Sequence, residues 1–263
     1  MLIPLACVFI LPLVWMISTS LKGNEQMTAW PPVWIPNPLH WENFVTAWTT
    51  SDFATYLWNT VFYTVLAGLG TVVTSSMVAF GFARLRFPGR DFLFGLLLAT
   101  LMLPSIVTLI PQYILFKQFN WLDSFRPLII PAWFGGGPFF IFLLRQFFRT
   151  IPNELFEQAT IDGASNYRAY WQIMLPLAKP ALSTVAIFSF LNFWNDFMGP
   201  LIYLNSAQKY TLTLGLRTFM QRQDVKVQEM MAMSLMMTIP VIILFFAFQR
   251  YFIEGVVMSG IKG

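Results

Sequence analysis

The stretch LWNTVFYTVLAGLGTVVTSSMVAFGFA, residues 57–83, decides the fold because it is long, mostly apolar and free of charged side chains. An α-helix needs roughly 20 mostly apolar residues to cross about 30 Å of hydrocarbon. Other apolar stretches reach or approach that length, and none alternates as barrel strands do. The full set is Met1–Ile17, Leu57–Ala83, Phe92–Phe116, Pro127–Leu144, Ala181–Leu204 and Met230–Gln249. The sequence therefore predicts an all-α, polytopic membrane protein with six transmembrane helices.

The composition supports a membrane protein and excludes other classes. Of the 263 residues, 57% are apolar and 11% are charged, whereas soluble domains average about 25% charged residues. A single Cys7 and a single His40 exclude a disulfide framework and a Cys/His metal site. The net charge of +4 comes from short basic clusters between apolar runs, so we expect no nucleic-acid partner.

The loop charges favour both termini in the cytoplasm. With the N-terminus inside, nine Lys and Arg residues fall in inner segments and seven in outer ones. The tight turn 84–90 holds three arginines, whereas the long outer loop 18–56 holds only Lys22. We expect the first apolar run to remain as a spanning helix, because it lacks a basic n-region and no Ala-x-Ala site follows it.

The outer loop is rich in tryptophan, with proline between the aromatic residues. The tryptophans are Trp30, Trp34, Trp41 and Trp48. Such rings could form a docking or sugar-stacking surface, or an aromatic belt at the membrane interface. We favour the belt.

One inner connection is long, residues 145–179, and it predicts two short helices. Pro152 suits the first turn of a helix, Asn153 can cap it, and Gly163 stands where that helix would end. A second helix is expected over residues 164–175, with Pro176 stopping it.

The first of these helices carries an acid, Glu157, and a small residue, Ala159. Leu155, Ala159 and Asp162 would share one face. Such a helix could enter a groove on a partner protein, where Glu157 would accept hydrogen bonds from Arg or Lys. It could equally lie flat on the membrane surface. The residues alone leave both interpretations open.

Glu157-Gln158-Ala159, Gly163 and Ile173-Met174-Leu175-Pro176 match the EAA signature, E-A-A-x3-G-x9-I-x-L-P, which marks permease subunits of binding-protein-dependent ABC importers. The chain departs from the signature at Gln158, where the pattern has Ala. It also resembles the maltose-type carbohydrate permeases at LWNT (57–60), ARLRFPG (83–89), FLLRQFF (142–148), FWNDF (193–197) and GIKG (260–263).

The resemblance implies a type I ABC importer transmembrane domain in the bacterial inner membrane, with both termini in the cytoplasm. It would comprise a first helix and external loop (1–56), a core (57–250) with the EAA loop at 145–180, and a cytoplasmic tail (251–263) that in some relatives reaches the ATPase. The EAA helix would be the coupling helix, seated in a cleft of that ATPase. The residues so assigned are Glu157, Gln158, Ala159, Asp162, Gly163, Ile173, Leu175 and Pro176.

The resemblance also implies partners: a second homologous permease subunit, an ABC ATPase dimer, membrane lipid, a sugar substrate and an extracytoplasmic solute-binding protein. Loop 209–229 is a candidate docking surface for that binding protein. The chain has no G-x-x-x-x-G-K-[ST] loop to cradle phosphates. We therefore expect no enzyme activity and no cofactor on this chain, with ATP and Mg²⁺ used by the partner ATPase.

Polar residues within the apolar stretches are candidates for a solute path. Asn192, Asn195 and Asp196 follow i, i+3, i+4 spacing, so one helical face would carry all three. They could form a hydrophilic wall of the cavity, or hold this helix against a neighbour. Gly135-Gly136-Gly137 predicts either a broken helix beside a cavity or close helix packing, and we favour packing. Hydroxyls in the second stretch (Thr71, Thr74, Ser75 and Ser76) are expected to pack between helices.

The leading functional hypothesis is one half of an import pore, worked by a separate ATPase. An ion- or proton-coupled carrier is disfavoured because Asp196 is the only acid well inside a span. A non-transporting anchor for an ATPase is a further hypothesis, which coupled uptake would exclude. Among ABC importers, the alternative load is a polyamine or another small polar solute, but a cationic load would favour several acids.

Overall fold

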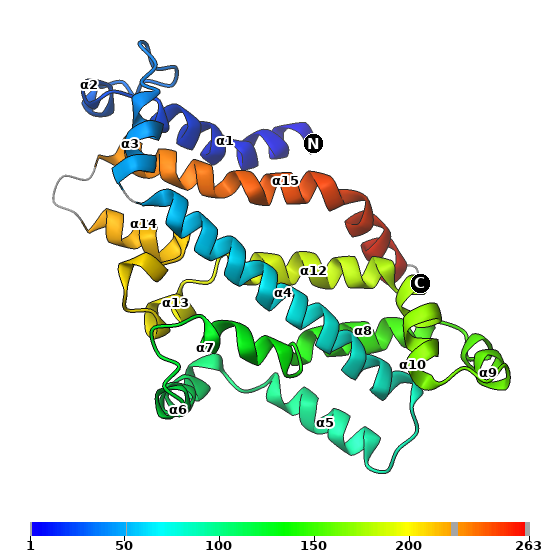
Figure 1. The fold of residues 1–263 in the computed structure, drawn as a ribbon. Coiled ribbons are helices and arrows are strands. Elements are labelled where there is room, and N and C mark those ends of the chain that lie inside the picture. The colour runs from blue at the N-terminus through cyan, green and yellow to red at the C-terminus, as the bar shows by residue number, and fades with distance from the viewer. Residues whose placement is uncertain (1, 51, 222–225, 261–263) are drawn as a thin grey trace. The chain divides into compact units, whose positions relative to one another are not determined.

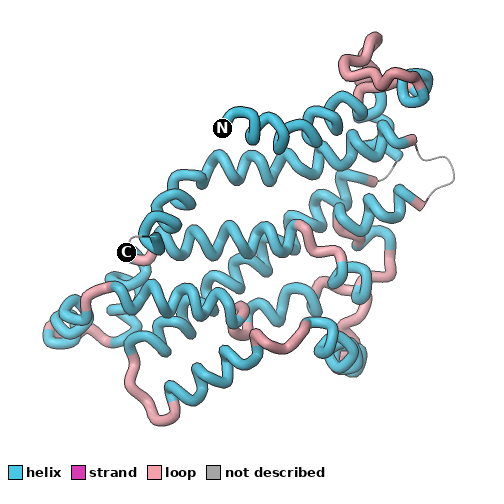
Figure 2. The backbone as a smooth tube through the Cα atoms, turned by 180° about the vertical axis from the view of Figure 1, so that it is seen from behind, coloured by secondary structure: helices cyan, strands magenta, loops and turns pink. Residues whose placement is uncertain are grey.

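The computed structural model describes the backbone of residues 2–50, 52–221 and 226–260, and the side chains of residues 4–50, 52–221 and 226–248. These residues form helices and loops without a strand, as Figure 2 shows. The longer helices are α1 (Leu2–Ser20), α4 (Phe53–Arg84), α5 (Arg90–Thr100), α6 (Ser105–Gln118), α8 (Pro138–Thr150), α12 (Lys179–Trp194) and α15 (Val227–Gly260). The shorter ones are α2 (Asn24–Thr28), α3 (Glu42–Thr50), α7 (Arg126–Ile129), α9 (Asn153–Ile161), α10 (Asn166–Ala169), α11 (Leu175–Leu177), α13 (Met198–Tyr203) and α14 (Leu212–Met220), with 3₁₀ turns η1 (Ile130–Trp133) and η3 (Ala207–Lys209) and the π-helical η2 (Tyr170–Met174).

The predicted apolar spans correspond to helices in the structure. Residues 53–84, 126–150 and 227–248 are each long and apolar enough to cross a membrane. Two bent pairs, α5 with α6 and residues 166–177 with α12, would each make a further span, and α1 is a shorter apolar helix. The chain is therefore an all-α, multi-pass membrane protein.

Three predicted spans are broken rather than continuous, at Pro104, at the glycine triplet 135–137 and after Trp194, which corrects the expectation of single helices. The third span bends by 98° between α5 and α6. Pro104, just before α6, disfavours helical geometry at the residue that precedes it. The fifth span ends as α12 at Trp194 and resumes as α13 at Met198. There the Asp196 carboxylate accepts the N–H of Gly199 and so starts a new helical turn.

The described residues form two compact units. The first comprises residues 1–60 and 206–245, and the second comprises residues 61–205 and 246–263. Figure 1 labels the helices of both. The backbone of α15 continues to Gly260, so most of the predicted tail 251–263 is helical, and residues 261–263 lie outside the described residues.

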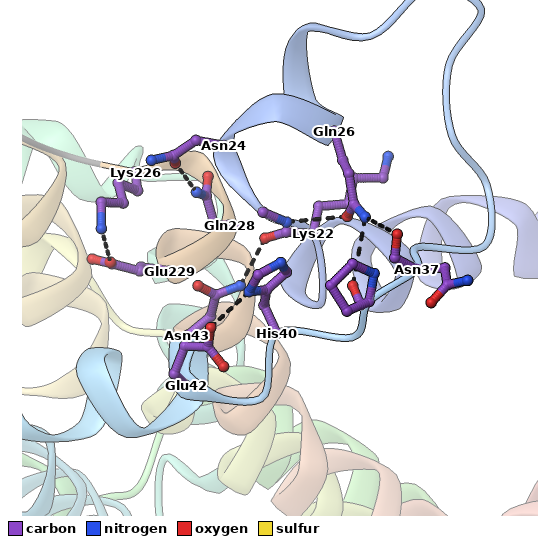
Figure 3. A network of polar contacts seen from close by, with 12 residues as sticks. Lys22, Asn24, Gln26, Asn37, His40, Glu42, Asn43, Lys226, Gln228 and Glu229 are labelled. Carbon is purple, nitrogen blue, oxygen red and sulfur yellow. Dashed lines mark hydrogen bonds and ion pairs between the residues drawn. The ribbon is translucent and has the colours of Figure 1, made fainter.

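Polar side chains hold the first unit together beyond the end of α1. Asn43, at the start of α3, donates its amide N–H groups to the carbonyls of Ser20 and Lys22, each at 2.9 Å. Gln228 of α15 donates to Asn24, as Figure 3 shows. The two bonds from Asn43 satisfy backbone carbonyls that the end of α1 leaves without helical partners.

The surroundings lower the pKa values of two side chains in this network, Lys22 and Glu42. Lys22 is buried with its ammonium 3.9 Å from the centre of the Trp15 ring, and burial lowers the pKa of this lysine. Nδ1 of His40 lies 2.6 Å from a carboxylate oxygen of Glu42 (Figure 3), and this hydrogen bond lowers the pKa of Glu42.

Within the first unit, two residues near the start of α4 bind the loop that precedes α14. The amide of Asn59 donates to the carbonyls of Gln208 and Tyr210, at 2.8 and 3.0 Å. The hydroxyl of Thr60 accepts the N–H of Leu212 at 2.8 Å. Asn59 and Thr60, the last two residues of the LWNT stretch, therefore fix the backbone of this loop.

The core of the second unit lies where α8, η2 and α12 pack on the C-terminal half of α4. On α8, the buried residues Phe140, Ile141, Leu144 and Phe148 recur at helical spacing, so they form one apolar face. The buried core comprises Ala79, Phe80, Phe140, Ile141, Leu144, Phe148, Ile151, Tyr170, Met174, Ala178, Ala181 and Val185. This core determines where the inner loop can attach.

Candidate functional site

The first candidate is the EAA segment, residues 153–177, which projects beyond the C-terminal end of α8 in Figure 1. Its first helix, α9, starts at Asn153, with Pro152 as the preceding cap residue. The prediction that Asn153 caps this helix is wrong. The side-chain oxygen of Asn153 instead accepts a hydrogen bond from the guanidinium of Arg84, at the end of α4. This bond attaches the start of α9 to the core unit.

The end of α9 is a glycine-terminated cap, as predicted. Gly163 has φ +81°, a left-handed conformation that side chains disfavour. Its N–H bonds to the carbonyl of Thr160, and the N–H of Ala164 bonds to the carbonyl of Ala159. This pair of bonds is the Schellman arrangement, which satisfies carbonyls at the helix end and turns the chain sharply.

The residues of the signature divide between two faces of α9. Glu157, Gln158 and Asp162 are exposed, whereas Ala159 is 8% exposed and lies against its own chain. Phe156 packs on the core with its ring 5.9 Å from that of Phe80. The helix therefore presents an acidic and amide-bearing face outward and attaches through Phe156 and Ala159.

The second half of the segment is a helix of three parts, α10, η2 and α11, and it runs past the predicted stop. Ser165 caps α10 by accepting the N–H of Arg168. Pro176 lies in the first turn of α11 rather than ending the helix, a position where its missing N–H is tolerated. Ile173 and Leu175 are half-buried, and Pro176 is exposed.

Two buried residues of η2 attach this half to the core. The Tyr170 hydroxyl lies 2.6 Å from that of Ser76 on α4, and its ring is 5.2 Å from that of Phe80. Met174 is fully buried. Our sequence reading assigned no attachment to these residues, although the i, i+4 spacing of Tyr170 and Met174 is a signal for a buried face.

The second candidate is the polar end of the fifth span. Asn192 and Asn195 are exposed, and the amide of Asn195 donates to the carbonyl of Leu191 at 2.9 Å. The expectation that one helical face carries all three polar residues is wrong, because α12 ends at Trp194, with Asn195 as its cap residue and Asp196 beyond it. Asp196 is half-buried, accepting the Tyr63 hydroxyl at 2.8 Å and the Gly199 N–H at 3.1 Å.

Asp196 therefore connects the break between α12 and α13 to Tyr63 of α4. Tyr63 is 2% exposed, and sequence reasoning missed it because one tyrosine in an apolar helix has no spacing signal. Asn192 and Asn195 remain the members of this set whose side chains are exposed.

The glycine triplet is both a helix break and a close contact. Gly135, Gly136 and Gly137 all have positive φ, and α8 begins directly after them. A Cβ at Gly136 would lie 2.0 Å from the Ser75 hydroxyl and 2.7 Å from the Thr71 carbonyl. The predicted close packing is therefore confirmed, and the helix is broken as well. The four hydroxyl residues singled out on α4 are buried or half-buried, as expected: Thr71, Thr74, Ser75 and Ser76.

The predicted outer surfaces are only partly described. All four loop tryptophans are exposed, and Trp30 reaches 89%. Within loop 209–229, α14 occupies residues 212–220, and residues 222–225 lie outside the described residues.

These features define a class of protein: an all-helical, multi-pass subunit with an anchored inner loop and no phosphate-binding loop in its sequence. Its fold matches that of a chain in the crystal structure of a bacterial ABC transporter involved in the import of the acidic polysaccharide alginate. The TM-score is 0.86 over 95% of this chain and 93% of the other, at 24% sequence identity.

Residues 71–257 match the family of binding-protein-dependent transport system inner membrane components, and the chain belongs to this family. It is 32% identical to the diacetylchitobiose uptake permease NgcG of Streptomyces coelicolor, covering 99% of this chain and 86% of that protein. It is also 32% identical to the arabinooligosaccharide permease AraQ of Halalkalibacterium halodurans, covering 98% and 93%. Identity to the sn-glycerol-3-phosphate permease UgpE of Yersinia pestis is 31%, covering 92% and 88%.

The family assignment confirms the predicted resemblance to ABC importer permeases. The chain is a membrane component of a binding-protein-dependent transport system.

Proposed function

We propose that this chain forms half of the translocation pore of an ATP-driven importer for a sugar or oligosaccharide. A second permease subunit of similar fold would form the other half. A solute-binding protein would deliver the load from outside, and a separate ATPase dimer would use ATP and Mg²⁺ at the inner face. Both termini of this chain would lie in the cytoplasm.

The observation that carries this proposal is the combination of exposed and buried faces in the EAA segment. Glu157 points outward on α9, where a carboxylate can accept hydrogen bonds from a basic side chain of a partner. Phe156 and Tyr170 hold the same segment against Phe80 of α4. A partner that moves α9 would therefore move the core of the second unit with it.

The proposed mechanism is mechanical. Closure of the ATPase dimer would displace α9, and Ser76, Phe80 and the buried face of α8 would follow through their contacts with η2. Packed cores do not deform continuously, so the displacement would be passed on as a movement of whole helices. The pore would then open alternately to each side.

The sugar load is argued from the relatives and from the exposed amides. NgcG and AraQ are permeases for diacetylchitobiose and arabinooligosaccharides, and the amides of Asn192 and Asn195 suit hydroxyl groups as donors and acceptors. A polyamine would need several acids along its path. Asp196 already binds Tyr63 and Gly199, which leaves it poorly suited to a cation.

The coupling role can be tested by charge reversal at Glu157. Glu157→Lys should insert normally but lose solute-stimulated ATP hydrolysis and uptake by at least tenfold, because a lysine repels the basic contact. Glu157→Gln, which keeps the shape, should retain part of the activity. Glu25→Lys reverses an exposed acid in α2 and should leave uptake unchanged. Normal uptake by Glu157→Lys would contradict the coupling role.

The load can be tested separately with the assembled importer in proteoliposomes. ATP hydrolysis is measured with the binding protein and, in turn, chitobiose, arabinotriose and spermidine. Stimulation by a sugar is the expected result. Stimulation by spermidine alone would overturn the sugar assignment, while the role as a permease would stand.

A further inference from the structure

A strongly basic cavity of about 460 Å³ lies in the second unit, and of the two candidate sites only Asn153, at the start of α9, contributes to its lining. Its lining residues are Phe82, Ala83, Arg84, Arg90, Asp91, Arg145, Arg149 and Asn153. The lining thus holds four guanidinium groups against one carboxylate. Because liquid water occupies about 30 Å³ per molecule, the cavity has room for roughly fifteen waters.

The cavity lies at the ends of three apolar helices. Arg84 is the last residue of α4, Arg90 is the first of α5, and Arg145 and Arg149 lie in the last two turns of α8. The proposed topology places these helix ends at the inner surface of the membrane. A phospholipid of the adjacent leaflet would therefore carry its phosphate at this depth.

Two of the arginines are occupied by structural contacts. Arg84 donates to the carbonyls of Phe148 and Ile151, so it serves the end of α8. Arg145 is 9% exposed, donates through Nε to the Phe82 carbonyl, and has its guanidinium 3.8 Å from the centre of the Phe94 ring. These contacts fix the direction of two positive groups at the cavity wall.

The remaining charges are not balanced. Arg90 bonds to Asp91 at 3.0 Å. Arg149 is exposed and makes no hydrogen bond or ion pair to the residues that the structure describes. Arg145 lies in the field of both Arg149 and Arg90, with Asp91 as the opposing charge. Like charges gathered this closely favour an anion between them.

We propose that this cavity binds the phosphate headgroup of an anionic phospholipid. A lipid is favoured over free phosphate because exposed apolar side chains continue from the cavity along α5. Phe92 is 75% exposed and Leu96, one turn further on, is 56% exposed. They offer acyl chains a surface directly beside the guanidinium groups, and basic pockets between spanning helices are typical sites for acidic lipid headgroups.

The site is tested by native mass spectrometry of the full-length chain, purified from membranes with the subunits that accompany it and then stripped of lipid. Dioleoylphosphatidylglycerol should bind more tightly than dioleoylphosphatidylcholine. Arg149→Gln and Arg90→Gln should each weaken phosphatidylglycerol binding about fivefold, and Asp91→Asn should strengthen it. Arg168→Gln removes an exposed arginine outside the cavity and should change nothing.

Three results would overturn the proposal. The first is equal binding of the two lipids by the unmodified chain. The second is full displacement of phosphatidylglycerol by millimolar inorganic phosphate, which would make the site one for free phosphate. The third is loss of the ATPase from the Arg149→Gln preparation with lipid binding unchanged, which would make the cavity a protein interface.

Discussion

Gly163 and Gly89 share the same left-handed backbone conformation. Alanine substitution at Gly89 is therefore a matched control for alanine substitution at Gly163. Gly163 has φ +81° and Gly89 has φ +78°, and a Cβ at either position would meet nothing within 4 Å. Alanine should therefore cost each site about 1 kcal/mol through backbone strain alone. Thermal unfolding of the purified complex should show similar losses, whereas uptake should fall for Gly163→Ala only. Equal uptake by both variants would argue against a coupling role for the turn after α9.

The Tyr63 hydroxyl of α4 donates a hydrogen bond to the Asp196 carboxylate. Tyr63→Phe removes this donor from a half-buried carboxylate and should lower the free energy of unfolding by about 1.5–3 kcal/mol. Tyr113→Phe is the control, because its hydroxyl makes no hydrogen bond to the described residues. Denaturant unfolding in detergent measures both. If the two variants were equally stable, the contact between Tyr63 and Asp196 would contribute nothing.

Within the broken helix of residues 126–150, substitution of Gly136 should destabilise the protein more than substitution of Gly135. Gly136→Ala would place a Cβ against the Ser75 hydroxyl and the Thr71 carbonyl, so α4 and the glycine loop before α8 must separate. Gly135→Ala has open space and should show backbone strain only. We expect Gly136→Ala to cost about 1–3 kcal/mol more than Gly135→Ala, measured by thermal unfolding of the purified chain. A smaller loss for Gly136→Ala would show that the two elements are not packed this closely.

At the scale of the whole molecule, the predicted orientation in the membrane has a direct test. Cys7 is the single cysteine of the sequence, so Cys7→Ser provides a background without thiols. Ile161→Cys and Trp30→Cys then place thiols at positions that are 84% and 89% exposed. An impermeant maleimide should label position 30 in intact cells and position 161 only in inverted vesicles. The opposite result would reverse the proposed topology.

Much of the fold could be predicted because burial in a membrane depends on local composition. An uncharged run such as Leu57–Ala83 must cross the bilayer as a helix, whatever its neighbours are. The exposed Glu157 and the turn at Gly163 were likewise predictable, because they follow from a motif and from the conformational freedom of glycine.

Only the tertiary structure decided how the helices are broken and what their polar groups contact. The break after Trp194, the inward face of Ala159 and the pairing of Tyr63 with Asp196 each depend on which helix lies opposite. The basic cavity was hidden for the same reason, since Arg145 and Arg149 of α8 meet the arginines of the turn 84–90 only in the folded chain. The free energy of transferring a segment into lipid is a sum over the residues of that segment. Hydrogen bonds and charge clusters instead require partners that only folding brings together.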